Sequence, residues 1–130
     1  MRYYIDISAA GKLIVTERES RILAEFLDEA TVGGARVLSS VLLETELRRL
    51  ASRLELPQTS VSGLLDRFDL LLPDLAWFRE AGMLAGRHLR SLDALHLAAA
   101  LRAGVDRLIT YDDRQAAAAE TFGLRVIRPS

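Results

Sequence analysis

Residues 91–129 read SLDALHLAAALRAGVDRLITYDDRQAAAAETFGLRVIRP, and this stretch decides the fold. Apolar residues at helical spacing predict one helix over 91–104 and another over 113–123, each ended by a glycine. The segments VDRLIT (105–110) and LRVIRP (124–129) are rich in branched apolar residues and predict strands. Because helices and strands alternate, we expect an α/β fold in which helices flank a parallel sheet.

The earlier part of the chain continues this alternation. Strands are predicted for RYYID (2–6) and ARVLS (35–39), and helices for 19–30, 40–54, 60–71 and 75–86. The 130 residues contain no repeat, low-complexity tract or linker. We therefore predict a single domain over residues 1–130, with a central parallel sheet of four or five short strands.

Composition excludes several classes of protein. Half of the residues are hydrophobic, but no apolar run approaches the roughly 18 to 20 residues that a membrane span needs. The N-terminal MRYYIDISAAGKLIV interrupts its apolar residues with charge, unlike a signal peptide, so we expect a cytoplasmic protein without a membrane partner. With no cysteine, a catalytic metal must be held by oxygen or histidine ligands.

Net charge gives little information about partners. The formal charge is −1 at pH 7, which argues neither for nor against a nucleic-acid ligand. Lys12 is the only lysine, so nearly all positive charge is arginine, whose planar fork suits phosphate. An arginine-rich composition can equally reflect genome base composition, and we favour that interpretation.

Two aspartates follow predicted strands. In a parallel sheet, ligand sites form beyond the carboxyl ends of the strands. Asp6 ends the first strand and Asp112 follows VDRLIT, so both lie where such a site would form. Aspartate is also a favoured N-cap, and each residue taken alone is explained by capping the next helix.

Asp93 is harder to explain by structure alone. Its helix, LDALHLAAAL, is apolar nearly all round, which is typical of a buried helix. Ser91 can cap this helix, and an acid in the first turn favours the helix dipole. A carboxylate in apolar surroundings nevertheless needs a partner, so we favour a functional role for Asp93.

Two glutamates compete in LLETELRRL. At about 100° per residue, Glu46 falls between Leu42 and Leu50, within the apolar arc, and is predicted to face inward. Glu44 lies on the other side, four residues before Arg48, as in an exposed ion pair. Glu46 is therefore the candidate site residue.

Four converging carboxylates would repel one another and take up protons unless a cation neutralised them. The cluster of Asp6, Glu46, Asp93 and Asp112 therefore predicts a metal. Oxygen ligands favour a hard divalent ion, Mg²⁺ or Mn²⁺, over zinc.

These motifs resemble those of PIN-domain ribonucleases, and specifically the VapC toxins of bacterial toxin–antitoxin pairs. The similarity spans nearly the whole chain and is carried by four stretches: DISAAGKLIV (6–15), SSVLLETELRRL (39–50), LRSLDALHLAAAL (89–101) and LITYDDRQAAAAETFGLRVIRP (108–129). The last two together are the most specific. The resemblance implies a PIN-like domain.

The resemblance also implies roles for particular residues. Asp6 and Asp93 would be the principal metal ligands, with Glu46 and Asp112 completing an acidic pocket. Hydroxyl positions beside the pocket fall on Ser8 and Thr110.

The implied function is the toxic component of a type II toxin–antitoxin system. It would be a Mg²⁺-dependent endoribonuclease, with Mn²⁺ as the alternative ion, that hydrolyses RNA phosphodiester bonds. The implied partners are RNA, a VapB-like antitoxin and a second copy of the chain in a homodimer.

Several other residues could take part. Arg90, Arg114 and Lys12, and also Arg49, lie near the acids in sequence or on the same helices and could hold RNA phosphates, although each alone is typical of a solvated charge. His96 could contact substrate, but we favour packing with a satisfied hydrogen bond. We expect His88 to be a surface residue.

Trp77 and Phe78 could receive an antitoxin segment or stack on a base. We favour core or dimer packing for both. Asp113 could substitute for Asp112, but the resemblance favours the first of the two aspartates.

Two other functions remain open. The chain could keep the fold and only dock a partner, as a non-catalytic binding module. It could instead use an aspartyl nucleophile, as phosphoryl-transfer enzymes and receiver domains do. The latter is disfavoured because Ser8 stands where a second aspartate would be needed and ARVLSS contains no acceptor aspartate.

Overall fold

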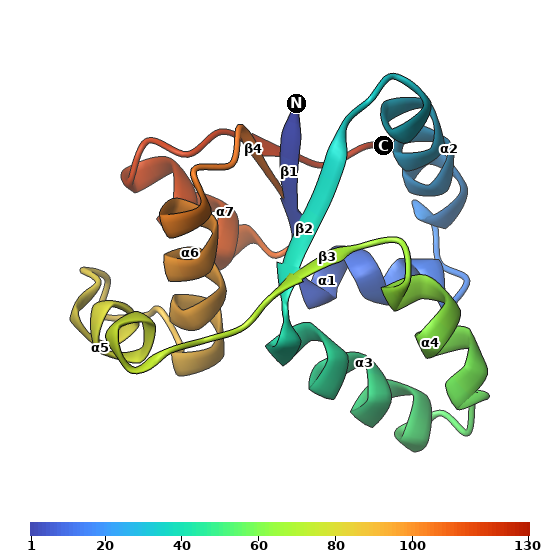
Figure 1. Ribbon diagram of the computed structural model, residues 1–130, viewed down its shortest axis with the longest axis horizontal. Helices are drawn as coiled ribbons and strands as arrows, with labels where there is room; N and C mark the ends of the chain where they lie inside the picture. Colours follow the sequence, from blue (N-terminus) through green and yellow to red (C-terminus); the bar gives the residue numbers. More distant parts are fainter.

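The computed structural model describes all 130 residues, and five parallel strands form its centre (Figure 1). The strands are β1 (Arg2–Ile5), β2 (Arg36–Ser40), β3 (Asp69–Leu71), β4 (Arg107–Ile109) and β5 (Val126–Ile127). They lie in the order β3-β2-β1-β4-β5, each parallel to its neighbours. The predicted α/β fold with a central parallel sheet is therefore confirmed.

Helices cover both faces of this sheet. They are α1 (Ile7–Ala10), the 3-10 helix η1 (Gly11–Leu13), α2 (Ser20–Val32), α3 (Val41–Arg53), α4 (Gln58–Leu65), α5 (Leu75–Met83), α6 (Ser91–Ala103) and α7 (Asp113–Thr121). In Figure 1, α5, α6 and α7 lie to one side of the strands and α1 to α4 to the other. None of the helices is long and apolar enough to cross a lipid bilayer.

Side-chain alternation along the strands divides the interior into two cores. Neighbouring residues of a strand point to opposite faces, and the three central strands each bury one residue in each core. Tyr4, Leu38 and Leu108 pack with α5, α6 and α7, whereas Ile5, Val37 and Ile109 pack with α1 to α4. All six are less than 10% exposed. Burial on both faces is what a parallel sheet requires.

The helix α6 lies deep in one core. Every residue from Ala94 to Ala100 is buried, which explains why its sequence is apolar nearly all round. Its alanines present little volume, so neighbouring elements can approach closely. As predicted, α6 ends at Gly104, which adopts the left-handed conformation (φ 63°) that favours glycine.

The strand order creates a crevice beside β1. The chain runs from β1 through β2 to β3 on one side, and then crosses to β4 and β5 on the other. Strand order thus reverses between β1 and β4, and the carboxyl ends of strands at such a point form a binding crevice. Asp6 follows β1 and Thr110 follows β4, so both lie at this crevice.

The prediction of one helix over 60–71 was wrong at its end. The helix α4 stops at Leu65, and residues 69–71 form β3 at the edge of the sheet. A short leucine-rich run fits either periodicity. Its strand conformation depends on the free edge of β2, where Leu38 aligns with Asp69 and Ser40 with Leu71.

Two smaller predictions also need correction, and two short helices were not predicted. The last strand is shorter than 124–129, because only Val126 and Ile127 pair with β4. The residue at the N-cap of α6 is Arg90, and Ser91 is the first helical residue rather than the cap. The short helices α1 and η1 were not predicted, since they are only four and three residues long.

Replacing Leu47 by alanine should destabilise the fold by about 2–5 kcal/mol, because this fully buried side chain fills the core between α3 and the sheet. The same change at Leu54, which is 47% exposed at the end of α3, should cost less than about 1 kcal/mol. Urea denaturation of both variants measures the difference. Equal losses would contradict the packing described here.

Candidate active site

Asp6 is held at the carboxyl end of β1 by three donors. Its Oδ1 accepts hydrogen bonds from Ser8 Oγ (2.6 Å) and Ala9 N (3.2 Å), and its Oδ2 accepts one from Thr110 Oγ1 (2.5 Å). The side chain is almost fully buried, and burial raises its pKa, although the bonds from Ser8 and Thr110 oppose this shift. The structure thus places the two predicted hydroxyl groups directly against Asp6.

Asp93 lies in the first turn of α6, and its carboxylate has no hydrogen-bond partner within the chain. Its pKa is raised, first by burial and then by the negative charges of Asp112 and Glu46. His96 and Arg90 lower the pKa but do not cancel the shift. Asp93 is therefore a partly buried acid that lacks a neutralising partner.

Asp112 both caps a helix and belongs to the acidic group. Its Oδ1 accepts from the backbone amides of Arg114 (2.8 Å) and Gln115 (3.1 Å), which makes it the N-cap of α7. Its Oδ2 has no donor in the chain. Asp6 likewise caps α1 through Oδ1. The capping interpretation is correct for both residues, and neither cap uses every oxygen.

Glu46 and Glu44 have the environments that the helical wheel predicts. The Glu46 side chain is 16% exposed, and its Oε1 lies 2.5 Å from His96 Nε2. Glu44 forms an ion pair with Arg48 at 2.8 Å and is 43% exposed. Glu46 is therefore the glutamate that joins the acidic group.

The charges of the acids act on Asp93 and on the buried Tyr4. Asp112 and Glu46 both raise the pKa of Asp93, and Asp6 and Glu46 both contribute to the raised pKa of Tyr4, whose main cause is burial. As the side chains stand, no three carboxylate or imidazole groups lie close enough together to form a ready metal-binding cluster. Mutual repulsion is consistent with this spacing.

Each acid nevertheless retains capacity for a cation. Asp93 has both oxygens free of donors, and Asp112 Oδ2 and Glu46 Oε2 have none. Asp6 Oδ2 accepts only one hydrogen bond, which leaves a lone pair. The donor set, oxygens of partly buried carboxylates, is one that hard divalent ions prefer.

A polar hollow of about 220 Å³ opens beside two of the acids. It is lined by Arg90, Asp93, Asp112, Asp113 and Arg114. The guanidinium groups of Arg90 and Arg114 form no ion pair in the chain, so both are available to an anionic ligand. Arg49 is likewise exposed and unpaired.

Asp113 and Lys12 are engaged elsewhere. Asp113 is 90% exposed and pairs with Arg128 at 2.7 Å. The Lys12 ammonium lies 2.9 Å from both Glu17 and Glu19 and 4.8 Å from the centre of the Tyr111 ring. Lys12 is therefore paired with acids of its own chain, and its role in holding phosphate stays a prediction.

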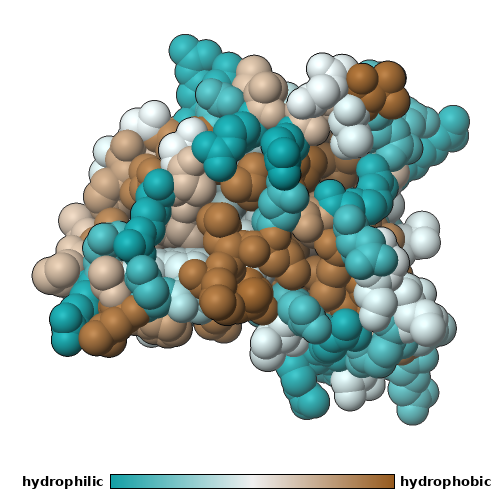
Figure 2. All heavy atoms as spheres, in the orientation of Figure 1, coloured by the Kyte–Doolittle hydropathy of each residue, from teal (hydrophilic) through white to brown (hydrophobic).

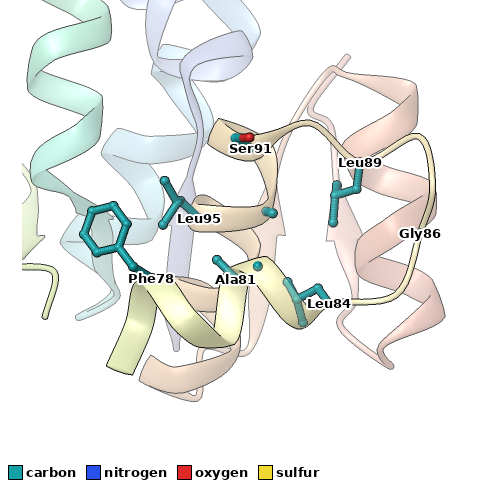
Figure 3. Close-up of a pocket in the computed structure, with 9 residues that line it drawn as sticks. Phe78, Ala81, Leu84, Gly86, Leu89, Ser91 and Leu95 are labelled. Atoms are coloured by element: carbon teal, nitrogen blue, oxygen red, sulfur yellow. The ribbon is translucent and has the colours of Figure 1, made fainter. Parts of the chain in front are cut away.

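The remaining candidates from the sequence, Trp77, Phe78 and His88, differ in how far they are buried. Trp77 is buried and donates from Nε1 to the Leu95 carbonyl oxygen (2.7 Å), which confirms core packing. Phe78 is 47% exposed, so it does not pack in the core, and the alternative of dimer packing stays a prediction for this residue. It lines an apolar hollow of about 340 Å³ between α5, α6 and the segment that joins them (Figure 3). His88 is exposed, as predicted.

Three buried polar residues, Tyr4, His96 and Gln115, lie beside the acids; packing with a satisfied hydrogen bond, predicted for His96, is confirmed, whereas Tyr4 and Gln115 were not predicted. His96 bonds Tyr4 Oη (2.7 Å) as well as Glu46, and Gln115 donates from Nε2 to the backbone oxygen of Asp93 (3.1 Å). Gln115 Oε1 is buried without a partner. The available signal was spacing: His96 and Gln115 each lie three residues after an acid, on the same helix face.

Comparison with known proteins agrees with this arrangement. Residues 3–121 match the model of the PIN domain. The chain belongs to the PIN-domain family. This PIN domain is 42% identical to "Ribonuclease VapC46" of Mycobacterium tuberculosis over 129 residues, which covers 98% of this chain and 97% of the relative. "Ribonuclease VapC35" of the same species is 41% identical over 135 residues, covering 97% and 96%.

Solved structures share the fold at lower identity. VapBC2 from Rickettsia felis, crystallised with a DNA fragment from its promoter, aligns with a TM-score of 0.75 at 14% identity over all of both chains. VapBC-1 from nontypeable Haemophilus influenzae aligns with a TM-score of 0.72 at 18% identity over 98% of both chains. The resemblance to PIN-domain and VapC proteins is thus confirmed.

Replacing Asp93 by asparagine should stabilise the metal-free PIN domain at pH 7. Because the folded-state pKa of Asp93 is raised, its charge disfavours folding above that pKa. The advantage of the variant should shrink as pH falls through the folded pKa and vanish below the unfolded value of about 3.9. Thermal denaturation in EDTA between pH 7 and pH 4 measures this.

The matched control is Asp66→Asn, at an exposed aspartate without an ion pair. It should change the denaturation temperature little at any pH in this range. An Asp93→Asn protein that is less stable than wild type at pH 7 would show that the carboxylate has a stabilising partner.

Proposed function

We propose that this PIN domain is the toxin of a type II toxin–antitoxin pair and an endoribonuclease that uses a divalent cation, Mg²⁺ or Mn²⁺. The observation that carries the proposal is Asp93, an unpaired and partly buried carboxylate beside Asp112 and Glu46. Such a group costs folding free energy unless a cation joins it. Full-length relatives named as ribonucleases support RNA as the substrate.

Asp6 and Asp93 would be the principal ligands of the ion, and Glu46 and Asp112 would support them. Asp6 follows β1 and Asp112 follows β4, the charges of Asp112 and Glu46 act on Asp93, and all four acids have oxygen lone pairs not used by the chain. The ion would supply Lewis-acid stabilisation of the phosphate and make a nearby water more acidic.

The chain's own residues would divide the remaining work. Hydrolysis adds water across a P–O bond of the RNA backbone, so a proton must leave the attacking water. Asp112 Oδ2 and Glu46 Oε2, which have no donors of their own, can accept it. Ser8 and Thr110 would keep Asp6 oriented, since both donate to its carboxylate.

Arg90 and Arg114 would hold the RNA backbone. They line the same hollow as Asp93 and Asp112, and neither has an acidic partner. Guanidinium groups can bind phosphate oxygens through two parallel hydrogen bonds. Phosphate contacts position a nucleic acid without reading its sequence, so these residues would contribute affinity rather than specificity.

Two protein partners complete the proposal. The structural neighbours include VapBC assemblies, which supports a VapB-like antitoxin as the cognate partner. A homodimer is supported by exposed apolar side chains on α5 and on the segment between β3 and α5: Leu72 (81%), Leu75 (64%) and Phe78 (47%). Figure 2 shows apolar atoms gathered across the middle of this face, where β3 passes in Figure 1.

The alternative is a PIN-fold module that binds a partner without catalysis. A module of this kind has no need of an unpaired acid that lowers stability. Titration with Mn²⁺ by calorimetry separates the two, because only the nuclease requires a site that depends on Asp6 and Asp93.

Asp93→Asn should abolish cleavage of RNA in the presence of Mg²⁺ or Mn²⁺, with a loss of at least about 100-fold in rate. Glu46→Gln should lower the rate by about 10- to 100-fold, as expected for a residue that supports a metal site. The matched control is Glu44→Gln, on the same helix but paired with Arg48, which should leave the rate unchanged.

In cells, wild-type protein should arrest growth unless its antitoxin is co-expressed, and Asp93→Asn should be harmless. Purified wild-type protein that cuts no RNA with either ion, together with equal harmlessness of both forms, would refute the proposed function.

Replacing both Arg90 and Arg114 by glutamine should raise the KM for RNA by about tenfold and leave kcat unchanged, since only phosphate contacts are lost. The dependence of log affinity on log salt concentration should flatten by about 0.7 per lost contact on single-stranded RNA. Arg125→Gln is the control, because Arg125 precedes β5 at the opposite end of the sheet. A fall in kcat alone would place the arginines in the chemical step.

A further inference from the structure

A buried polar chain, formed by Tyr4, His96 and Glu46, crosses the core behind the acids. Tyr4 Oη lies 2.7 Å from His96 Nδ1, and His96 Nε2 lies 2.5 Å from Glu46 Oε1. Tyr4 and His96 are at most 1% exposed, and Glu46 reaches the surface with 16% of its side chain. These three hydrogen-bonded side chains therefore connect the apolar interior to the acidic group.

Its members come from three different elements. Tyr4 lies on β1, His96 on α6 and Glu46 on α3. Tyr4 is two residues before Asp6 and so shares its face of the strand. His96 is three residues after Asp93 and lies behind it on the same helix face. Tyr4 thus lies close to Asp6 in the sequence and His96 close to Asp93, and His96 connects Tyr4 to Glu46.

The chemistry of the three groups fixes the direction of the hydrogen bonds. An ionised carboxylate only accepts, so His96 Nε2 carries the hydrogen that points to Glu46. In a ring with one proton, Nδ1 must then accept, and Tyr4 Oη is the donor. A tyrosine hydroxyl is protonated near neutral pH, so Tyr4 Oη has a hydrogen to donate.

Without His96, the Glu46 side chain would have no hydrogen-bond partner in the protein. It lies at the rim of the core, where a free carboxylate gains solvation by turning away from Asp93 and Asp6. The hydrogen bond from His96 opposes that movement. Because the ring is packed on all sides and contacts Tyr4 edge to face (centroids 5.7 Å apart), its position is set by the core.

We propose that Tyr4 and His96 are positioning residues: the Tyr4 hydroxyl fixes the tautomer of His96, whose Nε2–H holds the Glu46 carboxylate among the other acids. The inference deepens the proposed nuclease function and rests on it for its catalytic consequence. The tautomer itself is a property of the folded chain and can be tested without any metal or RNA.

The first test is ¹⁵N NMR of the full-length protein labelled at histidine. The chain has two histidines, so exposed His88 provides an internal control. His96 should carry its proton on Nε2, with Nδ1 unprotonated and hydrogen-bonded. Tyr4→Phe should shift the His96 signals towards a mixture of tautomers and leave His88 unchanged. A proton on Nδ1, or His96 signals that do not respond to Tyr4→Phe, overturns the proposal.

The second test measures Mn²⁺ affinity by calorimetry and the kinetics of RNA cleavage. Tyr4→Phe should weaken Mn²⁺ binding and lower kcat, each by about tenfold, with KM for RNA unchanged. The matched control is Tyr3→Phe, on the opposite face of β1, whose ring packs against Phe26 and whose hydroxyl has no partner. It should behave as wild type.

A second pair of variants keeps the test independent of Tyr4. His96→Gln retains an N–H donor near the position of Nε2 and should preserve more activity and Mn²⁺ affinity than His96→Leu, which retains none. If His96 serves only in packing, the leucine variant should match the glutamine variant in Mn²⁺ affinity, and the proposal fails.

The outcomes for the two proposals can be told apart. Wild-type protein that neither binds Mn²⁺ nor cleaves RNA overturns the proposed function and the positioning role with it. Active wild-type protein whose Tyr4→Phe form keeps normal kcat and Mn²⁺ affinity overturns only the positioning role.

Discussion

Repulsion among carboxylates at one end of the sheet is the constraint on which the rest of the structure depends. Asp6, Glu46, Asp93 and Asp112 come from four separate parts of the chain, and the negative charges of Asp112 and Glu46 add to burial in raising the pKa of Asp93. Three of the four carboxylates are stabilised by different interactions within the fold. Asp6 receives three donors, Asp112 caps a helix and Glu46 bonds an imidazole. The Asp93 carboxylate alone accepts no hydrogen bond from the chain, so its charge is available to a cation.

The architecture explains how such a group can be held at all. Three central strands bury one residue on each face, so two separate cores fix β1 and β4 from both sides. The crevice between their carboxyl ends is then a rigid place from which Asp6 and Thr110 project. The helix α6, buried over most of its length, fixes Asp93 in the same way. Rigidity of this kind is what a site needs if like charges are not to move apart.

Some residues near the acidic group stabilise the fold and still leave polar atoms without a partner in the chain. Asp6 and Asp112 stabilise helix termini through one oxygen and leave another lone pair free. Gln115 ties the first turn of α7 to the first turn of α6, yet buries an oxygen without a partner. The proposed nuclease function would give these compromises a common explanation, because a divalent cation needs carboxylate oxygens that the chain leaves free.

The sequence by itself determined the alternation of strands and helices, the α/β class and the candidate acids, because these depend on local periodicity and on residues that follow strands. It distinguished Glu46 from Glu44 by position on the helix, and the structure agrees. Only the tertiary structure decided that residues 69–71 form a strand, since that conformation depends on the free edge of β2. It alone also showed that Lys12 is neutralised by Glu17 and Glu19, and that Tyr4 and His96 lie behind Glu46. Contacts between distant segments follow from packing, which no local pattern in the chain encodes.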